Sequence, residues 1–456
     1  MTRRELIRVL AAAGLGAPFA SRVVAQDASE HAAPDGKTKE LEPFTVREGP
    51  RYPAELRGGK VIQPERPLDV IHETDVLVIG GGPAGFAAAV SAARAGAKTC
   101  VVERYGYFGG LWTGGLVLLV ISTHAKENGQ RIKVMRGIGD ELVERVDRIG
   151  GMIYRQNRDS EDKFNPTTDP EATKYMMDQM ISEAGAKVYF HSWVVDVIME
   201  GGAVRGAVIE SKAGRQAILA KVIVDASGDG DVFAAAGAEH ERRLHAIGLV
   251  HRLGNYDRAD REKMKAAGVK TLGGPEPEPS VRWINLRGPS TDCLDIEVLT
   301  RLEMEHRRAI FERVQKLRKT PGGEPLFLLQ TAPQLGVRTS RLLAGMHQLT
   351  FKDSREGKKF PDAIGVGGAQ GANHVGWPIP YGALLPKKVD NILAAGRCIS
   401  CDQKLIEDMR LIAACLITGH GAGAAAAVAV KSGCRPRDVD VGKVQALLRE
   451  QGAYLG

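Results

Sequence analysis

The sequence predicts an α/β protein that combines a dinucleotide-binding unit with a second region inserted into it. Residues 75–104 read as a short β-branched strand, a glycine-rich turn, an alanine-rich helix and a second strand. Near the end of the chain a similar pair occurs, the strand "NILAAGR" and the helix "IAACLITGHGAGAAAAVAVKSG". A length of 456 residues exceeds one simple core and predicts two or three domains. We therefore expect a Rossmann-like fold with other material between its two parts.

The composition excludes several classes of protein. Hydrophobic residues make up 43% and charged residues 26% of the chain, as in an ordinary globular protein. The formal net charge is +7, but no block of Lys and Arg is interleaved with aromatic residues, so we expect no binding to nucleic acid. Six cysteines in 456 residues are too sparse for a disulfide-stabilised scaffold. No residue pattern indicates a metal site.

The N-terminus resembles a twin-arginine export signal. Residues 1–25 contain the twin arginine Arg3-Arg4, a short apolar run and small residues that end at Ala25, where cleavage is expected. The apolar run is too short to span a bilayer, and we expect no transmembrane segment after it. The resemblance implies a periplasmic protein; the alternative is a disordered basic tail on a cytoplasmic one. Residues 26–70 are rich in charge, Pro and Gly and predict a linker or an extended N-terminal arm.

The order of the elements predicts the domain boundaries. We expect a first part of the dinucleotide-binding domain at 71–239, with an insertion at about 125–190. A substrate or cap region follows at 240–360, where the long amphipathic helix "DIEVLTRLEMEHRRAIFERVQKLRK" is predicted. The C-terminal part of the dinucleotide-binding domain is expected at 361–456.

The turn after the first strand carries the pattern Gly80-x-Gly82-x-x-Gly85. The first glycine permits the tight turn, the second lets a pyrophosphate approach the backbone, and the third lets helix and strand pack closely. The N-terminus of the following helix offers unpaired N–H groups to the pyrophosphate. Glu103 ends the second strand, where its carboxylate can accept hydrogen bonds from both ribose hydroxyls of an adenosine. This succession of elements predicts a bound dinucleotide.

Five segments together resemble the FAD-dependent oxidoreductases of the glutathione-reductase-like flavoprotein superfamily, whose relatives include fumarate reductase and succinate dehydrogenase flavoproteins. They are "GGGPAGFAAA", "YGYFGGLWTGG", "VIVDASGDGDVFAAAGA", "LGVRTSRLLAG" and "NILAAGRCIS" with the helix after it. The resemblance covers about residues 72–432 and is weakest in the middle third. It implies a Rossmann-like FAD-binding domain with an inserted substrate or cap domain, and FAD as the cofactor. No motif places a His or Cys for covalent attachment of the flavin, so we expect FAD to be dissociable.

The resemblance also implies which residues contact FAD. Asp229 is the candidate polar anchor, although it can also be a simple turn carboxylate, and the helix that begins near Arg410 is expected to aim its positive end at the flavin. The residues expected to bind the cofactor are Gly80, Gly82, Pro83, Ala84, Gly85, Glu103, Arg104, Gly110, Leu111, Thr113, Val195, Ala226, Ser227, Gly228, Asp229, Gly396, Arg397 and Arg410.

A second nucleotide site is not expected. Residues 365–371, "GVGGAQG", are rich in glycine but lack a strand–helix context, and we interpret them as a loop. With one dinucleotide fingerprint in the chain, NAD(P)H is not the expected partner. A quinone or a cytochrome is the expected electron acceptor, and a monomer or homodimer the expected state.

Three residues are candidates for catalysis. His374 precedes the segment "WPIPYGALLP", and Tyr381 lies within it; relatives usually carry Arg where this chain has Gly382, which puts the substrate type in doubt. His374 can act as acid or base, or be structural. Arg338, like its neighbour Arg341, can bind an anionic substrate or form internal ion pairs.

Cys398 and Cys401 form a Cys-x-x-Cys pair, which can be a redox dithiol beside the flavin or two packed cysteines. Together the motifs predict an FAD-dependent oxidoreductase that transfers a hydride from a small organic substrate to FAD and on to an acceptor other than NAD. A fumarate reductase-like reductase and a flavin-binding or assembly protein without turnover are the alternatives.

Overall fold

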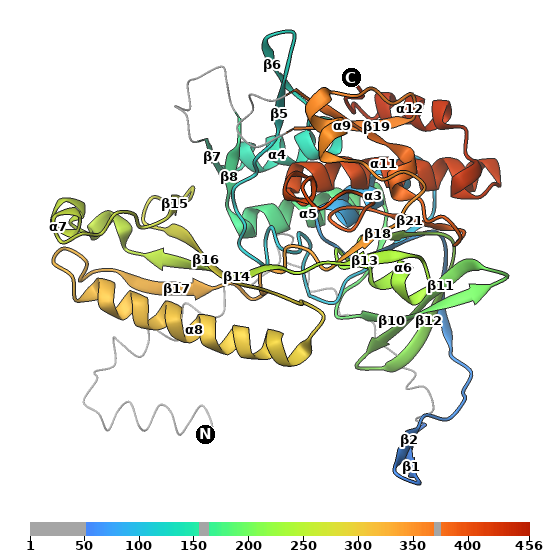
Figure 1. Ribbon diagram of the computed structural model, residues 1–456, viewed down its shortest axis with the longest axis horizontal. Helices are drawn as coiled ribbons and strands as arrows, with labels where there is room; N and C mark the ends of the chain where they lie inside the picture. The colour runs from blue at the N-terminus through green and yellow to red at the C-terminus, as the bar shows by residue number, and fades with distance from the viewer. Residues whose placement is uncertain (1–51, 155–163, 369–374) are drawn as a thin grey trace, which may run out of the picture. The chain divides into compact units, whose positions relative to one another are not determined.

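The structure, a computed structural model, describes residues 52–154, 164–368 and 375–456, all of which belong to one unit of the chain, Gly49–Gly456. Its main sheet has seven strands in the order β10-β11-β12-β3-β4-β9, with β21 paired to β12 (Figure 1). The strands are β3 (Val70–Ile79), β4 (Thr99–Val102), β9 (Lys187–Tyr189), β10 (Trp193–Glu200), β11 (Ala203–Ser211), β12 (Gly214–Asp225) and β21 (Ile392–Ala394).

The predicted strand–helix–strand unit is confirmed as β3, the helix α3 (Pro83–Arg94) and β4. The β-branched residues Val76 and Val78 of β3 are fully buried, as a central parallel strand requires. Helix α3 begins at Pro83, whose fixed φ suits the first turn, and its alanines allow neighbouring elements to approach closely. β3 and β4 are parallel, with Ile79 opposite Val102.

Strand β12 pairs with one antiparallel strand and with two parallel strands. Along one edge its first half pairs with β11 in antiparallel fashion, and its end, Ile223–Asp225, pairs with β21 in parallel. Along the other edge it runs parallel to β3. The strands β9, β4, β3, β12 and β21 therefore all end at the same edge of the sheet, which is where ligands of such sheets bind.

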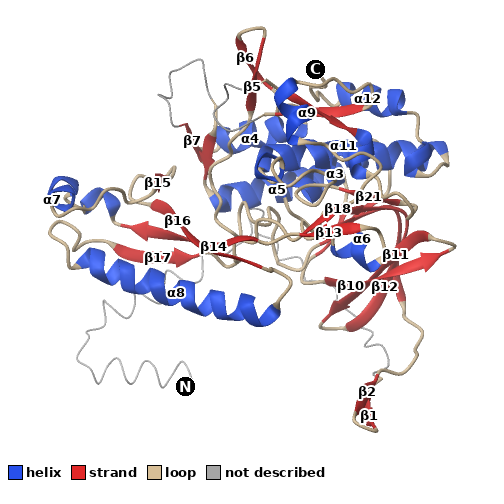
Figure 2. Ribbon diagram, in the orientation of Figure 1, coloured by secondary structure: helices blue, strands red, loops and turns tan. Residues whose placement is uncertain are grey.

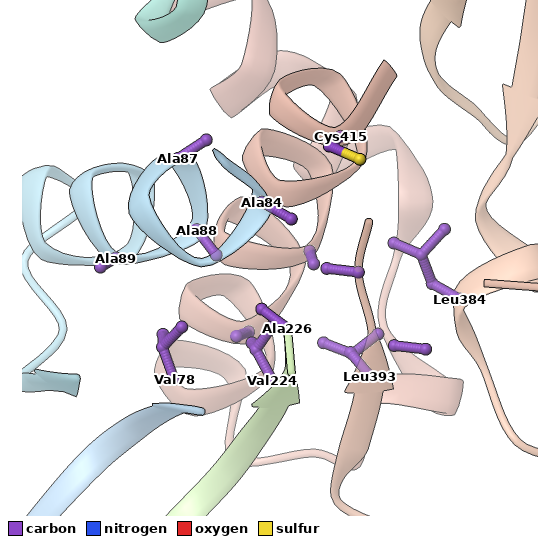
Figure 3. Close-up of a cluster of buried hydrophobic side chains, with 14 of the residues drawn as sticks. Val78, Ala84, Ala87, Ala88, Ala89, Val224, Ala226, Leu384, Leu393 and Cys415 are labelled. Carbon is purple, nitrogen blue, oxygen red and sulfur yellow. The ribbon is translucent and has the colours of Figure 1, made fainter. Parts of the chain in front are cut away.

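Helices α3 and α11 (Ile412–Ser432) pack against each other and against strands β3 and β12 of the main sheet (Figure 2). Ala84 and Ala88 of α3 face α11 in the core (Figure 3). Glycines of α11 make this approach possible, because a Cβ at Gly419 or Gly423 would collide with the backbone carbonyl of Ala84 or Ala88. Among the described helices α11 alone is long and apolar enough to cross a membrane, but its apolar stretch is wholly buried in the protein, as in a core helix.

A second sheet, β15-β16-β14-β17, carries helix α8 against it (Figure 1). Leu302, Ile310 and Val314 of α8 are buried, while its charged residues face solvent. This group of elements is called the cap below. It consists of β14 (His245–Gly254), α7 (Arg261–Ala266), β15 (Gly274–Pro275), β16 (Arg282–Thr291), α8 (Ile296–Arg318) and β17 (Phe327–Thr331).

The remaining elements are short hairpins and helices around these two sheets. The elements are β1 (Glu55–Arg57), β2 (Lys60–Ile62), β5 (His124–Glu127), β6 (Gln130–Lys133), α4 (Ile138–Arg148), β7 (Met152–Tyr154), β8 (Pro166–Thr168), α5 (Pro170–Ala184), α6 (Asp231–Ala235), β13 (His240–Arg242), β18 (Arg341–Leu343), α9 (Phe351–Glu356), β19 (Ala363–Gly367), β20 (Trp377–Pro380), α10 (Ile406–Met409) and α12 (Val441–Glu450).

The prediction of a loop at 365–371 is wrong for Gly365–Gly367, because these residues form the end of the buried strand β19. Gly367 has no side chain, and this leaves room for the ring of Trp377 on the paired strand β20.

Two buried histidines make the fold sensitive to acid. Burial lowers the pKa of His251 and of His420 to about 4, and neither ring nitrogen of His251 has a hydrogen-bond partner among the described residues. Between pH 6.5 and pH 4 the unfolded chain therefore binds protons that the folded protein does not, and stability falls as the pH falls through this range.

The variant His251→Leu is expected to reduce this acid sensitivity. From pH 7.5 to pH 5, one such histidine costs the wild type about 2 kcal/mol, and the variant loses that much less. At pH 7.5 the variant is expected to be at least as stable as the wild type, because it removes two unpaired polar atoms. Urea unfolding of both proteins at the two pH values measures the difference; parallel losses would contradict the assignment.

Candidate active site

A cavity of about 560 Å³ opens at the carboxyl edge of the parallel strands. The residues that directly follow four of these strands all line it: Gly80 after β3, Glu103 after β4, Ala226 after β12 and Ala395 after β21. Because parallel strands point the same way, residues from four distant parts of the sequence converge here. The cavity is therefore the place to test whether the chain fits the expected FAD.

The three glycines of the turn after β3 have three different environments. Gly80 has φ +97°, and a Cβ there would press on the backbone of Ala226. A Cβ at Gly85 would collide with the carbonyl of Gly80, so this glycine is needed for packing between helix and strand. At Gly82, which lines the cavity, an added Cβ would meet no protein atom within 4 Å. The space next to Gly82 is thus open to a ligand, as a pyrophosphate-binding turn requires.

The N-termini of α3 and α11 both lie at the cavity without a side-chain cap. The N-cap residues Gly82 and Leu411 line the cavity and supply no capping side chain. By contrast, α5 and α8 are capped by the carboxylates of Asp169 and Asp295. Two uncapped helix ends offer N–H groups and a positive dipole to one cavity, which suits a cofactor with a pyrophosphate and an electron-accepting ring.

Glu103 is held by the backbone of two neighbouring turns. One carboxylate oxygen accepts a hydrogen bond from the Gly81 N–H at 2.6 Å and the other from the Tyr105 N–H at 2.9 Å. Burial raises the pKa of Glu103, although these hydrogen bonds oppose the shift. A carboxylate has about four acceptor positions, so it retains capacity for two ribose hydroxyls.

Asp229 is a paired, half-buried carboxylate rather than a free turn residue. It lines the cavity, accepts a hydrogen bond from the Ser340 hydroxyl at 2.7 Å and pairs with Arg397 at 2.9 Å. Burial would raise the pKa of Asp229, but the charge of Arg397 and the hydrogen bonds outweigh it and lower the pKa. The Nε atoms of Arg397 and Arg410, two further cavity residues, are buried without a hydrogen-bond partner in the described structure. Such donors fit a site that is completed by a polar ligand.

Most of the residues predicted for the cofactor lie at this cavity. Three do not: Gly85, Thr113 and Val195. Those that line the cavity are Gly80, Gly82, Pro83, Ala84, Glu103, Arg104, Gly110, Leu111, Ala226, Ser227, Gly228, Asp229, Gly396, Arg397 and Arg410.

Gly85 and Thr113 support the site from behind. Gly85 packs against Gly80, as described above. Thr113 is 1% exposed and its hydroxyl donates a hydrogen bond to the carbonyl of Phe108 at 2.6 Å, which fastens the loop that carries Gly110 and Leu111. The cavity lining includes its neighbour Trp112 instead.

Val195 is not brought to the cavity. Its strand, β10, has an irregular register between Val194 and Asp196, and the Val195 side chain is 42% exposed. A bulge of this kind reverses the direction of a side chain on a strand. Its prediction as a residue that contacts the cofactor is therefore not supported by the arrangement of side chains.

The catalytic role predicted for Tyr381 is not supported either. The side chain is 3% exposed, its hydroxyl donates to the carbonyl of Pro436 at 2.7 Å, and the residue does not line the cavity. Burial raises the pKa of Tyr381 far above its usual value, so the phenol stays protonated. Tyr381 connects β20 to the C-terminal segment.

Replacement of Tyr381 by phenylalanine tests this structural role. The variant is expected to bind FAD like the wild type and to lose about 1 kcal/mol of stability, because one buried carbonyl loses its donor. Thermal unfolding and the ratio of FAD to protein measure the two effects. A variant that is as stable as the wild type but reacts more slowly with its substrate would restore the catalytic hypothesis.

The other candidate residues for catalysis differ in where they lie. His374 lies outside the described residues. Arg338 lines the cavity, whereas Arg341 forms an ion pair with Asp231 at 2.9 Å and donates to the carbonyl of Asp229. Of the two arginines, the first can therefore meet a ligand and the second forms internal contacts.

The cysteine pair matches packed residues rather than a redox dithiol. Cys398 and Cys401 are free thiols that are 0% and 1% exposed, and burial raises the pKa of both. A reactive thiol needs an exposed, low-pKa environment.

The sequence did not reveal the far half of the cavity, which residues 117–121, the cap and the loop after the cap provide. Apart from Arg338 and Glu303, these residues are apolar or uncharged, and they come from segments that are far apart in the chain, so no local motif identifies them. They include Val117, Leu119, Ile121, Val250, Trp283, Asn285, Leu299, Thr300, Gln334, Leu335 and Val337. We call this half the apolar chamber.

Comparison with known proteins finds similarity to curated sequences and to solved structures. The thiamine thiazole synthase of Methanococcus aeolicus is 30% identical over 187 residues, which are 39% of this chain and 62% of that enzyme. The enzyme of the same name from Sulfolobus acidocaldarius is 30% identical over 220 residues, or 44% and 72%. A geranylgeranyl bacteriochlorophyll reductase-like protein from Thermoplasma acidophilum has a TM-score of 0.44 at 16% identity, with 84% of each chain covered. The chain spans 58 to 62% of the length of the Methanococcus maripaludis and Methanococcus aeolicus enzymes.

The sequence profile of the family described as FAD dependent oxidoreductase matches residues 75–245 and 242–448. The match runs from within β3 into α12, so it contains the parallel strands, the cap and the residues of the cavity. It agrees with the open turn at Gly82, the carboxylate of Glu103 and the two uncapped helices, all of which fit FAD. The chain therefore belongs to the FAD dependent oxidoreductases and is an enzyme with FAD as its cofactor.

Proposed function

We propose that the protein is a dehydrogenase that removes a hydride from an organic molecule held in the apolar chamber and passes the electrons to an acceptor other than NAD(P). One observation carries this proposal. Gly82 and Glu103, Arg410 and Leu411, and Val250 and Leu335 of the chamber all line one cavity. A cofactor seated at Gly82 and Glu103 brings its reactive ring towards a substrate in the chamber.

When bound, FAD supplies the hydride acceptor and passes the electrons on. The chain's own residues orient the two reactants and prepare the site for charge. The N-terminus of α11 directs its positive dipole into the cavity beside Arg410, where it stabilises the negative charge that reduction adds. The side chains of Val117, Leu119 and Val250 exclude water from the reacting carbon, which protects the hydride transfer from solvent.

A nicotinamide partner is disfavoured by the arrangement of the elements. In the part of the chain that the structure describes, Gly80–Gly85 is the glycine-rich turn that follows a strand and opens a long helix. The other glycine-rich candidate, Gly365–Gly367, ends β19, and the element described after it is another strand, β20. A quinone or a cytochrome remains the proposed acceptor.

Anaerobic reduction of the purified holoprotein tests the proposal. Organic donors that fit the chamber are expected to bleach the flavin bands, and a soluble quinone is expected to restore them. NADH and NADPH are expected to bleach the bands at least a hundredfold more slowly. Rapid bleaching by NADPH would contradict the dehydrogenase proposal, and bound FAD that no donor reduces would favour a flavin-binding protein without turnover.

We also propose export through the twin-arginine route, which rests on residues 1–25 alone. This route carries folded proteins, so FAD can be inserted before export. These residues lie outside the described part of the chain. Fractionation of the producing cell tests the proposal: the mature protein is expected in the periplasm with its N-terminus at Gln26, and an intact N-terminus in the cytoplasm would contradict it.

A further inference from the structure

Arg338 is a half-buried guanidinium in the cavity without an acidic partner. Its recorded hydrogen bond runs from Nη1 to the carbonyl of Ala246 at 3.2 Å, and no carboxylate of the described residues forms an ion pair with it. The other cavity arginines are engaged: Arg397 with Asp229, Arg410 with Glu407, and Arg104 over the ring of Tyr105. Four of the five donor hydrogens of Arg338 thus remain for a ligand.

The surroundings of Arg338 are positively charged. Burial lowers its pKa, and the nearby guanidinium groups of Arg410 and Arg287 lower it further, while Glu407 alone raises it. Glu407 is already engaged, because it accepts hydrogen bonds from Arg410 and from His245. A partly buried arginine among other arginines is unfavourable unless an anion joins them. The local electrostatics therefore favour an anionic ligand at this point.

The rest of the chamber is largely apolar. Val117, Leu119, Val250, Leu335 and Val337 surround it with apolar side chains, and Glu303, which also lines it, is paired with Arg307 at 3.0 Å. Arg338 follows Val337 directly, so a guanidinium with no ion pair among the described residues lies beside the apolar surface. A small, fully polar acid would leave this apolar lining without a partner, and a neutral hydrocarbon would leave Arg338 without one.

We propose that the substrate is an organic acid with an apolar body: its carboxylate binds Arg338, and its apolar part lies in the chamber. The proposal rests on the proposed function, since it names the substrate class of that same cavity. The planar guanidinium suits a carboxylate because two parallel hydrogen bonds can form. Arg338 and Arg410 line the same cavity, so the proposal places the carboxylate towards the cofactor residues and presents the carbon atoms next to it for oxidation.

Ligand binding to the oxidised holoprotein tests this without any turnover. The probes are phenylacetate with its neutral counterpart phenylacetamide, and acetate as an acid without an apolar body, each followed through the change it causes in the flavin absorbance. In the wild type, phenylacetate is expected to bind at least tenfold more tightly than either of the other two. In Arg338→Gln, binding of phenylacetate is expected to weaken about tenfold to a hundredfold, while binding of phenylacetamide stays the same.

Two further variants complete the design. Arg301→Gln removes an exposed arginine of α8, whose ion pair with Glu305 is 3.9 Å long, and is expected to leave all three affinities unchanged. Trp283→Ala removes an aromatic wall of the chamber and is expected to weaken phenylacetate and phenylacetamide by the same factor. All variants are checked for FAD content and thermal midpoint.

Three results would overturn the proposal. Equal binding of phenylacetate and phenylacetamide to the wild type would remove the role of the charge. Loss of FAD from Arg338→Gln would assign this arginine to the cofactor instead of the substrate. Unchanged affinities in Trp283→Ala would remove the apolar half. Because none of these measurements needs a reducible flavin, failure of the dehydrogenase proposal in the donor experiment stays distinguishable from failure here.

Discussion

Replacement of Gly82 by valine is expected to give a folded protein that does not retain FAD. An added Cβ at this position meets no protein atom within 4 Å, so the first side-chain carbon enters the apoprotein without a clash. The same space lies at the N-terminus of α3, where the backbone must approach the pyrophosphate. The absorbance spectrum of the purified variant, with a reconstitution attempt in excess FAD, measures the loss. Normal flavin content would contradict the placement of the cofactor.

A second glycine of the same turn is the matched control. Gly85→Ala adds one methyl group that would collide with the carbonyl of Gly80, and this carbonyl belongs to a backbone that cannot move independently of β3. This variant is expected to lose stability, by about 3 kcal/mol or more, before cofactor binding can be judged. The two glycines thus separate a defect in binding from a defect in folding. Equal thermal midpoints for the two apoproteins would show that this distinction is wrong.

The sequence allowed the cofactor half of the site to be predicted because its information is local. The strand, the three glycines, the helix and Glu103 follow one another within 75–104, and each residue type is needed for a contact inside that unit. Gly80, Gly82 and Glu103, predicted as cofactor residues, lie together at the cavity in the structure. The burial of Cys398 and Cys401 likewise follows from their position after β21, inside the core.

The apolar chamber could not be predicted, because its residues share no local pattern. Val250 comes from β14, Trp283 from β16 and Leu299 from α8, and they meet only after the cap sheet has formed. In these elements the residues that line the chamber, such as Val250, Asn285 and Thr300, are of types that strands and helices commonly contain. Their pattern fixes the type of element but not which neighbour covers it.

The hydroxyls of Tyr381 and Thr113, both predicted as site residues, have internal partners in the structure for a common reason. Both residues lie in segments rich in glycine or proline near the site, and both carry a hydroxyl that could serve a ligand. In the structure each hydroxyl is used by a backbone carbonyl, of Pro436 and of Phe108. Buried hydroxyls in irregular segments are needed to satisfy the backbone, and proximity in sequence does not distinguish this use from catalysis.

Helix α11 connects the fold to the site in a way that a substitution can measure. Its Gly419 lies against the backbone of Ala84, the second residue of α3, and its Thr418 hydroxyl accepts a hydrogen bond from the Gly396 N–H at 3.0 Å. The contact between α3 and α11 therefore sets the distance between the two uncapped helix ends that serve the two ends of FAD. A change at Gly419 should affect stability and cofactor binding together.

The variant Gly419→Ala is expected to lose about 2–3 kcal/mol of stability and to release FAD more readily than the wild type. Helix propensity alone predicts the opposite sign, a gain of up to about 1 kcal/mol. Gly442→Ala isolates that propensity effect, because Gly442 lies at an exposed position of α12 and the nearest atom to the new Cβ is an oxygen of Asp440 at 3.1 Å. Its free energy of unfolding should stay within about 1 kcal/mol of the wild-type value. Urea unfolding of the holoproteins and titration of the apoproteins with FAD measure both quantities. If Gly419→Ala were stabilised like Gly442→Ala, the close contact between α3 and α11 would not exist as described, and the distance between the two helix ends would have to be set by the strands instead.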